Sequence, residues 1–145
     1  MSRVAPFAVA ALIALAISAS TPAAGAPPLR VVVPAPPAAG QWQQLGATVV
    51  SRPGKQLRFF RTVNYPKNLG LVVTSSTSQL IHVSWWSDCE VQSDDGYTEE
   101  HQQTITGTHR VIAYPPVFDG ATDCYIQVTA RAGRRAAVAA ALFTG

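Results

Sequence analysis

Residues 80–92 read LIHVSWWSDCEVQ, and apolar and polar side chains largely alternate along them. A β-strand sends successive side chains to opposite faces, so this pattern predicts a strand with one buried face. Cys89 falls on the apolar side of the run, and Cys124 does the same in a second alternating run, 123–131. The two patterns therefore predict that both sulfurs point into one core. The side chains that share these two faces are Ile81, Val83, Trp85, Ser87, Cys89, Val91, Cys124, Ile126, Val128 and Ala130.

The start of the chain has the layout of a secretory signal peptide. Residues 1–3 carry a positive charge, residues 4–17 are apolar apart from Pro6, and small residues lead to the end of the segment at Ala26. The apolar run is shorter than the ~18–20 residues of a membrane-spanning helix. We therefore predict that residues 1–26 are a signal peptide, that the protein is secreted into the extracellular space, and that the mature chain has no membrane span. An uncleaved anchor is the alternative.

If the chain is exported as predicted, its two cysteines are expected to be oxidised. Disulfides form and persist in oxidising compartments outside the cytosol, so Cys89 and Cys124 are predicted to form one disulfide. In the chain-entropy model, closing a loop of this length stabilises the fold by about 3.5–4 kcal/mol. Two free thiols are the alternative.

The remaining sequence divides into two parts. Residues 27–40 are rich in Pro and Ala and predict an extended spacer, disordered or laid along the surface. Residues 41–145 are long enough for a single small domain. Their short alternating runs, separated by turn residues, predict an all-β fold: a small antiparallel β-sandwich of about seven strands. The predicted strands are 45–51, 56–63, 69–75, 80–92, one return strand within 97–113, 123–131 and 135–143.

The last predicted strand is ambiguous. Residues 135–143 are rich in Ala, a strong helix former, and Val138 and Leu142 lie four apart as on a helix face. We favour a strand because the preceding residues, 131–134, are typical of a hairpin turn.

Trp85 lies four residues before Cys89 on the same inward face and could pack over the disulfide. This resembles immunoglobulin domains, in which a Trp packs against the disulfide that joins the two sheets. The order of Trp and cysteines differs from that family, so the resemblance concerns architecture alone. It implies an immunoglobulin-like sandwich, and a jelly-roll-like sandwich is the other arrangement considered.

Charge is distributed unevenly along the chain. Every acidic residue lies at or after Asp88. The formal net charge of the whole chain is only +3. Such a small excess does not predict nucleic acid binding, because arginines scattered along strands usually form a solvated face. A basic patch for anionic sugars or wall polymers is a weaker alternative, formed by Arg52, Lys55, Arg58, Arg61 and Lys67.

The outward face of the long strand contains the candidate ligand-binding residues. Trp86 lies there with His82 and Asp88, and Phe60 occupies an outward position on the second predicted strand. Aromatic rings exposed on a sheet can stack against sugar rings, and the polar neighbours can bond sugar hydroxyls. We therefore predict a non-catalytic module that binds a polysaccharide or a protein through a sheet face. In the alternative interpretation, the Pro-rich spacer or a hairpin covers Trp86, and the protein is structural or inhibitory.

No motif predicts an enzyme, a metal site or a cofactor. His82, His101 and His109 have no metal-ligand spacing, and no nucleophile or phosphate-loop motif is present. The acidic turn around Asp94 and Asp95 lacks the spacing of a calcium loop. A hydrolase remains a minor alternative.

Overall fold

The computed structural model describes residues 32–93 and 96–145, which form nine β-strands and no helix. The predicted signal peptide and the start of the spacer lie outside these residues. The prediction of an all-β fold is confirmed, and the described residues include no helix that is long and apolar enough to cross a membrane. The strands are β1 (Gln43–Gln44), β2 (Val49–Val50), β3 (Leu57–Asn64), β4 (Leu69–Ser75), β5 (Leu80–Val91), β6 (Thr98–Thr108), β7 (Arg110–Ala113), β8 (Ala121–Arg131) and β9 (Val138–Thr144).

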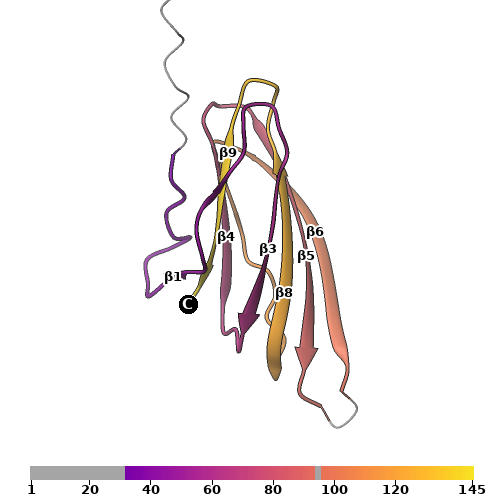
Figure 1. The fold of residues 1–145 in the computed structure, drawn as a ribbon. Coiled ribbons are helices and arrows are strands. Elements are labelled where there is room, and N and C mark those ends of the chain that lie inside the picture. The colour runs from indigo at the N-terminus through magenta and orange to yellow at the C-terminus, as the bar shows by residue number, and fades with distance from the viewer. Residues whose placement is uncertain (1–31, 94–95) are drawn as a thin grey trace, which may run out of the picture.

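The strands pair as one long hairpin folded onto itself. The antiparallel pairs are nested, β2 with β9, β3 with β8, β4 with β7 and β5 with β6. Sheet A has the order β1-β9-β4-β7, with β2 also paired to β9, and sheet B has the order β3-β8-β5-β6. Figure 1 shows the two layers, with β3, β8, β5 and β6 side by side in one of them. This strand order is that of a jelly roll, the second of the two sandwich arrangements considered from the sequence.

The predicted disulfide between Cys89 and Cys124 is present. The two residues are direct partners on neighbouring strands, β5 and β8, and their Cα atoms are 4.0 Å apart. The bond therefore lies within sheet B, whereas the immunoglobulin resemblance implied a bond between the two sheets. Trp85 is on the same inner face and only 2% exposed. The alternation of buried and exposed residues along β5 and β8 follows the predicted parity.

The predicted return strand within 97–113 is two strands in different sheets. β6 pairs with β5 in sheet B, and β7 pairs with β4 in sheet A. The chain changes sheet at His109, which has a left-handed backbone with a φ of 61°. Its carbonyl accepts a hydrogen bond from the backbone N–H of Ser75, at the end of β4. This corner, rather than a change in the side-chain pattern, separates the two strands.

The strand interpretation of 135–143 is confirmed. β9 pairs with β4 on one side and with β1 and β2 on the other. Val138, Ala140 and Leu142 belong to the main core between the sheets. Ala141 and Phe143 face the other side of sheet A, where they form a second cluster with Val72 and Trp42. β9 is thus buried on both faces.

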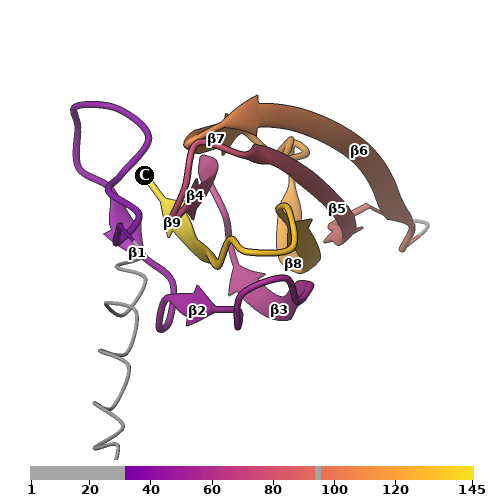
Figure 2. The ribbon, with the colours of Figure 1, turned by 90° about the horizontal axis from the view of Figure 1, so that it is seen from above.

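The arm, residues 32–40, covers part of that outer side of sheet A (Figure 2). Thr74 on β4 donates a hydrogen bond to the carbonyl of Val32, and Arg110 on β7 donates to the carbonyls of Ala35 and Pro36. Pro37 is buried against the backbone of Gly70. The described part of the spacer is therefore attached to sheet A and leaves the outer face of sheet B uncovered.

Candidate functional site

Strand register brings the predicted binding residues onto the outer face of sheet B. β8 lies between β3 and β5, so Phe60, Gln127 and Trp86 are direct partners across three strands. Gln102 on β6 continues the same row. Phe60 and Trp86, which are 26 positions apart in the sequence, therefore lie on one surface, separated by a single strand.

Tyr125 on β8 joins the two predicted aromatic residues. Its ring lies 5.6 Å from the ring of Phe60, with an angle of 25° between the planes, and 5.9 Å from the ring of Trp86, in an edge-to-face arrangement. Phe60 is 61% exposed, Tyr125 is 36% exposed and Trp86 is half-buried. We call these three residues the aromatic cluster. It forms a contiguous apolar surface on a face that is otherwise polar apart from Leu80, at the start of β5.

Tyr125 was not among the binding residues predicted from the sequence. The outward orientation of Tyr125 could be predicted, because it stands between the inward residues Cys124 and Ile126. What the sequence lacks is the order of the strands, which places β8 between β3 and β5.

The other two predicted residues flank the aromatic cluster at different distances. Asp88 is the direct partner of Tyr125, but its Oδ1 is enclosed and has no hydrogen-bond partner within the described ranges. His82 lies four residues from Trp86 along β5, or about 13 Å at the rise of a strand. Its direct partner on β8 is Arg131. His82 therefore belongs to a separate part of the face.

A chain of shallow hollows connects these two parts. The hollow at the aromatic cluster has a volume of about 500 Å³. It is lined by Arg58, Phe60, Tyr125 and Gln127 of the outer face, and by Phe59 and Arg61, which have the inward parity of β3. A small one of about 70 Å³ beside Trp86 shares Gln127 with it. A third, of about 290 Å³, shares Ser84 and Thr129 with the second. We call the series, together with the end hollow described next, the trough.

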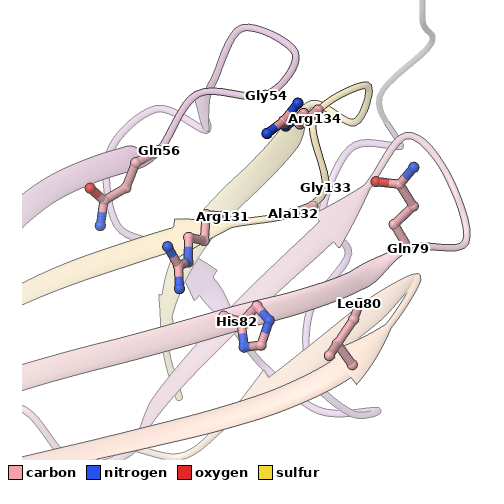
Figure 3. Close-up of a pocket in the computed structure, with 9 residues that line it drawn as sticks. All are labelled: Gly54, Gln56, Gln79, Leu80, His82, Arg131, Ala132, Gly133 and Arg134. Carbon is pink, nitrogen blue, oxygen red and sulfur yellow. The ribbon is translucent and has the colours of Figure 1, made fainter.

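The end hollow is the largest, at about 660 Å³, and Figure 3 shows its lining. It shares Gln56, His82 and Arg131 with the third hollow. The side chains of His82 and Arg131 extend beside each other from neighbouring strands, and Arg134 lies farther from them, next to Gly54, on the turn between β8 and β9 (Figure 3). Among the described residues, no carboxylate lines any of the four hollows.

Hydrogen bonds fix several polar side chains along the trough. Arg58 donates to Oε1 of Gln127 at 3.0 Å, next to the aromatic cluster. Ser84 and Thr129 bond to each other at 2.9 Å between the cluster and the end hollow. These contacts hold amide and hydroxyl groups in place, with remaining bonding capacity for a ligand.

Acidic residues occupy the opposite end of the same face. Glu90 is the direct partner of Asp123, and Asp88 is the direct partner of Glu100. Within the described ranges, no group of three or more His, Cys, Asp or Glu side chains could hold a metal ion. Asp94 and Asp95 of the acidic turn lie outside those ranges.

The three histidines lie in three different places. His82 lines the trough, His109 forms the corner between the sheets, and His101 packs 6.4 Å from the ring of Trp85. The structure does not bring them together.

The chain matches no protein-family model, no curated protein and no solved structure.

Proposed function

We propose that this protein is a secreted, non-catalytic module that binds a carbohydrate chain along the outer face of sheet B. The observation that carries the proposal is the exposed aromatic cluster at one end of the trough. A pyranose ring has an apolar face of C–H groups and a rim of hydroxyls. Phe60 and Tyr125 provide aromatic surface for such a face, while Gln127 and Gln102 lie in register beside Trp86 to bond the rim.

The composition of the face favours a carbohydrate over a protein partner. A stable protein interface covers about 800 Å² on each partner and has an apolar centre. Here three rings form a narrow strip bordered by amides, hydroxyls and charges, and the trough runs along the strands. An extended chain of sugars fits a narrow, mostly polar trough better than a broad protein surface does.

Secretion is supported by two independent features. Residues 1–26 have the charge, apolar run and small residues of a signal peptide. The disulfide is fully buried in the core, and such bonds are typical of exported proteins.

The test is binding of the folded, exported chain to a glycan array, repeated with the variants Phe60→Ala and Tyr125→Ala. Each variant should weaken binding to the captured glycan at least tenfold. An exposed aromatic pair contributes about 1 kcal/mol to stability, so the melting temperature should fall by no more than about 8 °C. Tyr97→Ala is the matched control, since Tyr97 is an exposed aromatic residue outside the trough.

Two outcomes would overturn the proposal. A native protein that binds no glycan would favour a structural or inhibitory role. Variants that unfold far below the native melting temperature would show that the aromatic cluster serves stability rather than recognition.

A further inference from the structure

We propose that the carbohydrate is anionic, and that the end hollow of Figure 3 is a subsite for its carboxylate or sulfate groups. This inference rests on the proposed carbohydrate function and specifies its ligand class. It assigns a role to Arg131 and Arg134, which are not part of the aromatic cluster.

The end hollow concentrates positive charge. Arg131 is the last residue of β8 and Arg134 lies in the turn that follows it, and both residues line the same hollow. A guanidinium group presents a planar fork of N–H donors that matches a carboxylate or a sulfate. Because no carboxylate among the described residues lines the hollow, an anion entering it meets attraction without a competing acidic group.

The hollow is also placed correctly for one ligand to reach the aromatic cluster. Each hollow shares lining residues with the next, and the separation of about 13 Å between His82 and Trp86 along β5 spans a few sugar rings. Arg58 lies in the row of Thr129 and Ser84, between the end hollow and the aromatic cluster, and it borders the aromatic hollow. A polymer with a charge on every sugar would thus meet cationic groups in the end hollow and again partway along the trough.

The acidic end of the face limits where along β5 the charged ligand can lie. Asp88 and Glu100 lie immediately beyond the row of Trp86, and Glu90 and Asp123 lie one row further. These carboxylates repel a polyanion. The charged segment is therefore held between the aromatic cluster and the end hollow rather than along the whole length of β5.

The test compares matched charged and neutral ligands on the full exported chain. Polygalacturonate is compared with its fully methyl-esterified form, and a sulfated glucan with the unmodified glucan. Affinity electrophoresis or calorimetry at low and high salt measures binding. We expect each charged polymer to bind at least tenfold more tightly than its neutral counterpart at low salt, with the difference reduced at high salt. The carboxylate and sulfate arms show which anion the hollow accepts.

The double variant Arg131→Gln/Arg134→Gln should remove that tenfold preference, so that the charged polymer binds no more tightly than its neutral counterpart. Lys67→Gln is the control, because it removes one positive charge from the turn between β3 and β4, outside the trough. Both positions of the double variant are exposed, and circular dichroism should show a native fold.

The outcomes separate this inference from the proposed function. If charged and neutral polymers bind equally, and binding still requires Phe60, the end hollow is no anion subsite while the carbohydrate function stands. If Lys67→Gln weakens binding as much as the double variant, the effect is general charge attraction and the subsite is refuted. If none of these polymers binds but the native protein captures a neutral glycan on the array, the anion subsite is refuted and the carbohydrate function stands. If the array also captures nothing, both proposals fail.

Discussion

Removing the disulfide should destabilise the fold by several kcal/mol. The bond joins residues with a sequence separation of 35, and the chain-entropy model gives about 3.8 kcal/mol for closing a loop of this size. Whole domains are typically stable by about 5–15 kcal/mol, so the loss is a large share of the total. We therefore expect the variant Cys89→Val/Cys124→Val to remain folded at room temperature with much reduced stability.

The choice of valine separates the cross-link from the packing. The two cysteines occupy a closely spaced, directly opposed pair on β5 and β8, a position that suits β-branched side chains. Both positions are fully buried, so Cys89→Ala/Cys124→Ala adds the cost of a cavity to the loss of the bond. The stability lost in the valine pair gives the contribution of the cross-link. The further loss in the alanine pair gives the cost of the cavity.

Urea unfolding followed by tryptophan fluorescence is the assay. The valine pair should lower the free energy of unfolding by about 3–4 kcal/mol, and the melting temperature should fall by roughly 15 °C or more. Because the bond is fully buried, the comparison with reduced protein requires reduction in denaturant and refolding with reductant present, and it should give a similar loss. A valine pair within about 1 kcal/mol of the native protein would refute the loop-entropy argument, because strand pairing alone would then account for the stability.

Two further predictions concern the arm and the corner. Gly70→Ala should loosen the arm, because a Cβ at this position would overlap Pro37; limited proteolysis should then cut residues 32–40 faster, and an unchanged rate would contradict the described contact. His109→Gly should raise the free energy of unfolding by up to about 1 kcal/mol, because glycine adopts the left-handed backbone of the corner without steric cost. A loss of stability in urea would show that the side chain of His109 contributes more than its backbone strain costs.

The parity of single strands could be predicted from the sequence, because it depends only on neighbouring residues. The odd positions from Ile81 to Val91 and the even positions from Cys124 to Ala130 are buried, as the alternation indicates. The positions of Phe60 and Trp86 on one outer face follow from the same rule once the sheet is known. Tyr125 and the trough could not be found this way, because they depend on which strands lie side by side.

The corner at His109 was not predicted from the sequence, and the strand at 135–143 was ambiguous, for physical reasons. Gly107, two residues before His109, is the one glycine near the corner, and the apolar residues Ile105 and Val111 keep one parity on either side of it, so the pattern indicates a single strand. The Ala-rich β9 has high helix propensity, but burial on both faces of the strand outweighs that preference. The arm that covers one of those faces is distant in sequence, so no local pattern indicates it.

The nested strand pairing sets the order in which the molecule can form. Among the described strands, only β5 and β6 are hydrogen-bonded neighbours that are also consecutive in the chain. Every other pair must close a longer loop, and β2 with β9 closes the longest of the nested set. Such a high contact order predicts folding in milliseconds to seconds rather than microseconds. Since β9 is synthesised after all its partners, sheet A has no complete centre, and the arm no complete docking surface, until the chain has been made through residue 144.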